Sequence, residues 1–213
     1  GMGVHGCKTV IYEPQPKRAR DIARSILLNR LEGTTTVHNA AVTTMESVSL
    51  SQPPAPGSVD IGGGEQGSAP VDIVPGERID VVLAGQSILF LKVDVEGFED
   101  GVVDVSIGLF QAGLVQHAVF EYTPRQFEHK GTNYRDFLPM LFRDLGAKKC
   151  YLCHRLKGVV FQLPEDPTVL KQIHDGLYAI SMQTDVYCMF SAGERPDLFP
   201  SAAIMTPRTS LLA

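Results

Sequence analysis

The sequence lacks long apolar runs and an excess of basic residues. No stretch of about 18 uninterrupted apolar residues occurs, and no charged start followed by an apolar core marks a signal peptide. We therefore expect no membrane partner and a cytoplasmic location. Lys and Arg total 19 against 24 Asp and Glu, for a net charge of -5. Because binding to a phosphate backbone needs a basic surface, nucleic acid is not an expected partner.

Cysteine is also infrequent. The four cysteines, Cys7, Cys150, Cys153 and Cys188, lack the density of a secreted disulfide scaffold, so we expect reduced thiols. The string Cys150-Tyr-Leu-Cys153-His154 does match the pattern for covalent haem attachment, and its thiols suit zinc or redox chemistry. However, the segment reads as a strand, which sends Cys150 and Cys153 to opposite faces, and no second ligand pair completes a metal site. We expect no metal.

Composition is that of an ordinary folded domain, because 44% of the 213 residues are apolar and only 20% are charged. We predict one domain over residues 1–195 and an irregular tail over 196–213. Residues 51–76 are rich in Pro, Gly and Ser and lose all periodicity, which predicts a long loop. This loop is either functional or a mobile insertion.

Strand and helix patterns alternate along the chain. Residues 8–12 and 36–42 read as strands, and between them a helix runs from Pro16 to Leu31 with Gly33 as its stop. Further strands are predicted near 88–95, 118–122, 149–152, 158–163 and 185–191, and helices over 99–110, over 133–145 and from Asp166. This order predicts an α/β fold with a doubly wound, mostly parallel sheet.

The most informative stretch runs from Ile88 to Glu99, where an apolar run suddenly becomes acidic. Such a run is typical of a strand buried on both faces, and ligands bind outside the carboxyl ends of the strands in open α/β sheets. Alternation along the strand puts Lys92, Asp94 and Glu96 on one side. Lys92 and Asp94 form either a structural ion pair or part of a site. Glu96, a second carboxylate at the same end, favours a site.

Four strings, Val10-Ile-Tyr-Glu-Pro14, Asn39-Ala-Ala-Val42, Leu91-Lys-Val-Asp-Val-Glu-Gly-Phe-Glu99 and Phe120-Glu-Tyr122, together resemble the FkbM-type methyltransferases. The resemblance covers about residues 9–191. It implies a fold of the class I methyltransferase (Rossmann-like) type with S-adenosylmethionine as cofactor. It also implies an O-methyltransferase that acts on a hydroxyl of a sugar or small natural product.

The same resemblance assigns roles to individual residues. Glu13 would accept the ribose hydroxyls of the cofactor, and Asn39 to Val42, with Ala41 among them, would lie beside its adenine. Asp94 and Glu96 would lie near the methyl group as base or orienting groups.

On the acceptor side, the resemblance places Glu121 and Tyr122. Lys92 would keep Asp94 in place and ionised. We add His129 from the following loop as a proton acceptor. A divalent metal held by the acids is less favoured, because the sequence shows no further ligand set.

One feature of the family does not match. Its first strand and Gly-rich turn should precede Glu13 by roughly 20 residues, on the spacing of dinucleotide folds. Only twelve residues do so here, and Gly1 to Gly6 is not framed by a strand and a helix. We therefore expect a truncated chain, or a sheet that closes without this strand, and cofactor binding that is weak or absent. The alternatives are a non-catalytic remnant that serves as an interaction module, and a nicotinamide enzyme.

Overall fold

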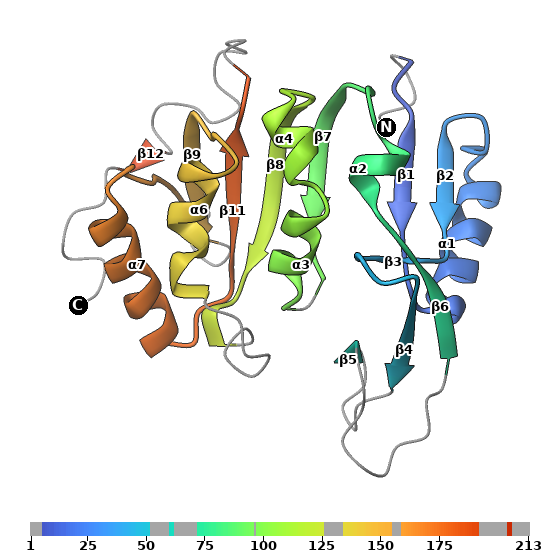
Figure 1. Ribbon diagram of the computed structural model, residues 1–213, viewed down its shortest axis with the longest axis horizontal. Coiled ribbons are helices and arrows are strands. Elements are labelled where there is room, and N and C mark those ends of the chain that lie inside the picture. The colour runs from blue at the N-terminus through green and yellow to red at the C-terminus, as the bar shows by residue number, and fades with distance from the viewer. Residues whose placement is uncertain are drawn as a thin grey trace. The chain divides into compact units, whose positions relative to one another are not determined.

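A computed structural model describes residues 6–51, 60–61, 72–95, 97–125, 134–154, 159–191 and 204–205 (Figure 1). The chain divides into two compact units, Gly1–Val82 and Leu83–Ala213. Whether both belong to the single domain expected over residues 1–195 stays a prediction. In the described residues, no helix has the length and apolar character to cross a membrane.

The first unit begins with the predicted strand–helix–strand. Strand β1 (Thr9–Tyr12) pairs in parallel with β2 (Thr35–His38), and helix α1 (Pro16–Leu28) connects them. Pro16 occupies the first turn, as predicted, because its fixed φ suits that position. The helix stops earlier than expected. Arg30 adopts a φ of 56°, which helical backbone does not allow, so the chain turns before Leu31 and Gly33 are reached.

A second sheet completes this unit. The strand expected over 36–42 is broken after His38, and its end forms β3 (Ala41–Val42). The strand order is β3-β6-β4-β5, with β4 at Ser47–Ser51, β5 at Asp60–Ile61 and β6 at Asp72–Glu77, and the short helix α2 (Ile79–Val82) follows. Both ends of the segment 51–76 are therefore strand rather than loop. Residues 52–59 and 62–71 lie outside the described part.

The second unit contains a six-stranded mixed sheet of order β12-β10-β9-β11-β8-β7. Its strands are β7 (Ile88–Val93), β8 (Val115–Tyr122), β9 (Lys149–His154), β10 (Val159–Gln162), β11 (Thr184–Met189) and β12 (Ile204–Met205). The pairs β7–β8 and β10–β12 are parallel, whereas β11 is antiparallel to both of its neighbours. The α/β class is therefore confirmed, with a mixed sheet.

Figure 1 shows the helices of this unit along one face of its sheet. They are α3 (Glu99–Asp104), α4 (Ile107–Gln111), α6 (Phe137–Arg143) and α7 (Pro167–Ala179), and the 3-10 turn η2 (Tyr134–Asp136) precedes α6. Phe120 of β8 packs against Phe110 and Phe137, with ring centroids 6.5 and 5.6 Å apart. Asp166 caps α7 by accepting hydrogen bonds from the N–H groups of Thr168 and Val169.

Candidate functional site

Two of the predicted acids lie at neighbouring positions at the carboxyl ends of two parallel strands. β7 and β8 run in parallel, and their last paired residues are Val93 and Phe120. Asp94 follows Val93 and Glu121 follows Phe120, so both acids come directly after this pair, at the carboxyl ends of their strands. By the alternation of side chains, both belong to the face opposite to that of Val93 and Phe120.

The predicted pair of Lys92 and Asp94 is present. Lys92 Nζ donates a hydrogen bond to Asp94 Oδ2 at 2.5 Å. The pair is not buried, however, because the Lys92 side chain is 57% exposed and that of Asp94 34%. An exposed ion pair contributes only about 0.2–1 kcal/mol to folding. Stabilisation of the strand end is therefore a weak explanation for these two charges.

Glu121 and Tyr122 have different surroundings. Glu121 is buried and accepts a hydrogen bond from Gln183 Nε2. Tyr122 is fully buried and stacks on Phe137, at 5.6 Å between ring centroids. Its hydroxyl lies 2.6 Å from His174 Nδ1, and burial raises the pKa of this tyrosine. Tyr122 therefore packs in the core on the helix side, and the expected contact of Tyr122 with substrate stays a prediction.

Glu99, which was not predicted as a site residue, is the most deeply buried acid near this edge. It is 0% exposed. Its Oε1 accepts hydrogen bonds from the N–H groups of Val95 and Gly97, each at 3.3 Å, and its Oε2 accepts one from the Tyr134 hydroxyl at 3.0 Å. Burial raises the pKa of Glu99, against the effect of these hydrogen bonds. The only sequence signal was its place at the end of the acidic string.

Glu13 and Asn39 meet at the carboxyl ends of β1 and β2. The Asn39 Nδ2 group donates hydrogen bonds to the carbonyl oxygens of Glu13 and Pro14, both at 2.9 Å. Glu13 Oε1 accepts one from the N–H of Gln15 at 2.8 Å. Ala41, by contrast, is buried in the small core of the second sheet. Two of the three predicted cofactor residues, Glu13 and Asn39, thus lie together in the structure. The third, Ala41, packs in a hydrophobic core.

Three further side chains gather at this end of the first unit. Tyr12 and His38 are register partners with ring centroids 4.8 Å apart. His38 Nδ1 lies 3.0 Å from Glu77 Oε2. Burial, and then the Glu77 carboxylate, raise the pKa of Tyr12 to about 12. The sequence did not predict this cluster, because Glu77 is separated from His38 by 39 positions and no local pattern links them.

Two predicted residues, Glu96 and His129, lie outside the described residues. The others are divided between the units. Glu13, Asn39 and Ala41 belong to the first unit, and Lys92, Asp94, Glu121 and Tyr122 belong to the second. The structure therefore describes two acidic strand ends, one in each unit.

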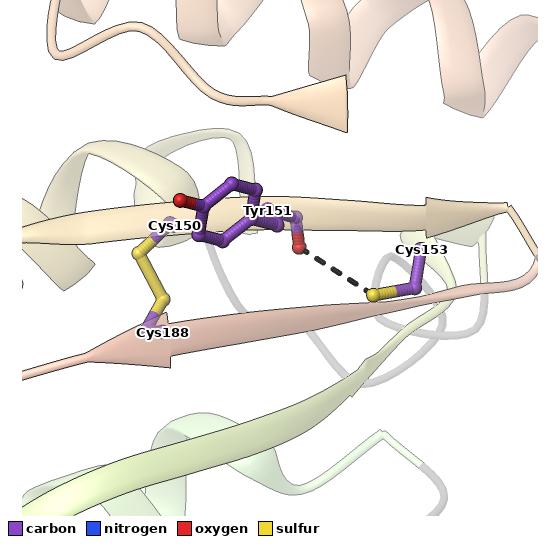
Figure 2. The surroundings of a disulfide bond; sticks show 4 residues. All are labelled: Cys150, Tyr151, Cys153 and Cys188. Carbon is purple, nitrogen blue, oxygen red and sulfur yellow. Dashed lines mark hydrogen bonds between the residues drawn. A yellow bond between two sulfur atoms is a disulfide. The ribbon is translucent and has the colours of Figure 1, made fainter. Parts of the chain in front are cut away.

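The expectation of reduced cysteines is wrong for two of the four. Cys150 of β9 and Cys188 of β11 are register partners and form a disulfide, as Figure 2 shows. Cys7 and Cys153 are free. Because its sulfur is bonded to Cys188, Cys150 is not available as a thiolate for haem attachment or zinc. Burial also raises the pKa of Cys153, whose thiol contacts the Tyr151 carbonyl oxygen at 3.9 Å.

No protein-family model matches the chain, and no curated protein matches its sequence. The resemblance to FkbM-type methyltransferases therefore stays a prediction that rests on the four strings.

Proposed function

We propose that the chain is an S-adenosylmethionine-dependent O-methyltransferase, or a part of one, with the doubly wound arrangement of the class I enzymes. Its acceptor would be a hydroxyl of a sugar or small natural product. The observation that carries this proposal is the acidic edge at the carboxyl ends of β7 and β8, where Lys92 holds Asp94 and Glu121 occupies the neighbouring position. This is the edge at which ligands bind in open α/β sheets.

The residues of the first unit fit part of the cofactor. A carboxylate suits a vicinal diol, because its two oxygens only accept hydrogen bonds. Glu13 uses Oε1 for the N–H of Gln15, and no contact within the described residues uses its Oε2. Asn39 holds the backbone that follows the Glu13 side chain, through the carbonyl oxygens of Glu13 and Pro14. Glu13 would therefore hold the ribose of S-adenosylmethionine.

The chemistry asked of the second unit is modest. When bound, S-adenosylmethionine supplies a methyl group already activated by its positive sulfur. The oxygen of the acceptor hydroxyl would form a bond to the methyl carbon while the bond between this carbon and sulfur breaks. Asp94 would accept the proton that the hydroxyl loses. The Lys92 ammonium favours the ionised form of Asp94, which is the form that accepts a proton. Glu121 would orient the acceptor.

The test is incubation with S-adenosylmethionine and a panel of sugars and small hydroxyl compounds, followed by mass detection of a product heavier by one methylene group. A product that is lost with Asp94→Asn supports the proposal. Equal product formation by the wild type and by Asp94→Asn would refute the role of Asp94 as base.

A non-catalytic remnant is the second candidate, and one observation favours it. In the described residues β7 pairs only with β8, and Phe90 is 43% exposed. A strand with such a continuous apolar run is normally covered on both faces. A protein of this kind would give no methylated product from any acceptor and would still fold cooperatively.

The cytoplasmic location expected from the sequence stays a prediction. The disulfide between Cys150 and Cys188 weighs against it, because cytosolic thiols are normally kept reduced.

A further inference from the structure

Glu99 is a carboxylate in a place where a carboxylate is costly. It is completely buried, and no Lys or Arg forms an ion pair with it among the residues that the structure describes. Moving such a group out of water is unfavourable unless hydrogen bonds compensate. An apolar side chain of similar size would fill the same space without this cost. The presence of an acid at this position is therefore explained by the groups that it binds.

Those groups belong to two segments at the acidic edge. One oxygen of Glu99 holds the N–H groups of Val95 and Gly97, in the segment that follows β7. The other oxygen holds the hydroxyl of Tyr134, which is buried at the start of η2 and stacks on Phe137. Gly97 has a φ of 96°, a conformation that favours glycine, so this segment bends sharply in front of α3. Through these hydrogen bonds Glu99 links the bend at Gly97 to the buried Tyr134.

The bond to Val95 acts directly on Asp94. The Val95 N–H lies in the same rigid peptide plane as the Asp94 carbonyl group. Fixing that N–H fixes the peptide plane after Asp94, and the pairing of β7 with β8 up to Val93 holds the chain before it. Together these two constraints set the direction of the bond from Cα to Cβ of Asp94. Lys92 then holds the far end of the same side chain. Backbone and carboxylate of Asp94 are therefore held by two different residues.

We propose that Glu99 is a positioning residue, which fixes the backbone after β7 so that the Asp94 carboxylate points to the acceptor hydroxyl. This role rests on the proposed function, in which Asp94 is the base. A displacement of about 1 Å at a reacting group costs about a hundredfold in rate. Glu99 therefore contributes to catalysis through Asp94, without touching the substrate.

The test compares four variants of the full chain. Glu99→Leu removes both acceptor oxygens, Glu99→Gln keeps one for the two N–H groups, and Tyr134→Phe removes only the donor to Oε2. Leu170→Ala, in the core of α7, is the control for general loss of stability. Two quantities are measured in each variant: amide hydrogen exchange at Val95 and Gly97, with Ala118 and Phe120 of β8 as references, and methyl transfer.

We expect Glu99→Leu to speed exchange at Val95 and Gly97 by about tenfold or more relative to the β8 amides, since each lost hydrogen bond is worth about one such factor. Glu99→Gln should restore protection to within about threefold, because an amide oxygen still accepts both bonds. Tyr134→Phe and Leu170→Ala should leave unchanged the ratio of the exchange rates of these two amides to those of the β8 amides. Turnover should fall about a hundredfold in Glu99→Leu and recover in Glu99→Gln, with cofactor affinity constant.

Unchanged protection of both amides in Glu99→Leu would overturn the proposal. Protection in Glu99→Gln that is no higher than in Glu99→Leu would also overturn it. Faster exchange without any loss of turnover would also overturn it, because the bend would then be irrelevant to Asp94. A wild-type chain that protects the Val95 and Gly97 amides but methylates no acceptor refutes the proposed function. The role of Glu99 in catalysis is refuted with it. Failure of the two claims is thus distinguishable.

Discussion

The hydroxyl of Tyr122 lies 2.6 Å from Nδ1 of His174, and both side chains are buried. His174 also stacks on Tyr178 of its own helix, at 6.3 Å between ring centroids. Burial lowers the pKa of His174, and this effect outweighs the neighbouring carboxylate of Asp175, while Arg135 lowers the pKa further. The folded chain therefore favours the neutral imidazole more than the unfolded chain does.

This relationship predicts a dependence of stability on pH. The pKa of His174 in the folded chain lies below the ordinary value of about 6.5 that it has in the unfolded chain. Between these two values the unfolded chain binds the proton more readily, so the contribution of His174 is complete above pH of about 6.5 and is lost as the pH falls below it. Urea unfolding of the wild type and of His174→Gln, at matched pH values, measures this contribution as a difference.

The wild type should lose more stability than His174→Gln as the pH is lowered. All other titratable groups are the same in both proteins, so their effects cancel in the comparison. Parallel pH profiles for the two proteins would refute the assignment to His174.

Several elements could be predicted because their signals are local. Pro16 at the first turn and the capping Asp166 mark helix starts within a few residues, and the change from apolar to charged residues after Leu91 marks a strand end. The pair of Lys92 and Asp94 follows from alternation along one strand. Local spacing therefore located β1, the start of α1, the first part of β2, β7 and one of the site's contacts.

The remainder depends on partners that are distant in sequence. Cys150 and Cys188 are 38 positions apart, and the connectivity of cysteines cannot be deduced from spacing. Glu99 accepts a hydrogen bond from Tyr134, which is 35 positions away. The antiparallel direction of β11 beside β8 is equally invisible, because a buried strand has the same apolar pattern in either direction.

The disulfide gives a second prediction. Protein purified without reductant and then denatured should show two reactive thiols of the four cysteines, from Cys7 and Cys153. The double variant Cys7→Ser with Cys153→Ser should show none. Reduction of the wild type should lower the free energy of unfolding by about 2–4 kcal/mol, because a crosslink over 38 positions restricts the unfolded chain. Four reactive thiols would contradict the bond.

A third prediction separates a catalytic Asp94 from a structural one. In any form of the protein that transfers methyl groups, Asp94→Asn should reduce turnover by about a hundredfold or more, because the amide cannot accept the proton, while cofactor affinity stays constant. Stability should change by less than about 1 kcal/mol, since the pair with Lys92 is exposed.

Asp144→Asn is the matched control, because Asp144 is also 34% exposed and its partner Arg143 is 58% exposed. It should leave turnover unchanged. A loss of several kcal/mol in Asp94→Asn, without an effect on turnover, would show that the pair with Lys92 is structural.

The most direct test of the methyltransferase account is a titration of the 213-residue polypeptide with S-adenosylmethionine, followed by the amide NMR signals of the first unit. The account predicts weak binding at most, with a dissociation constant of about 1 mM or above, because the residues of the first unit fit part of the cofactor. Shifts should centre on the amides of Glu13 and Asn39. The affinity should fall about tenfold in Glu13→Ala and should stay unchanged in the control Glu32→Ala. Shifts that centre on other residues, or shifts that Glu13→Ala leaves unchanged, would contradict the account.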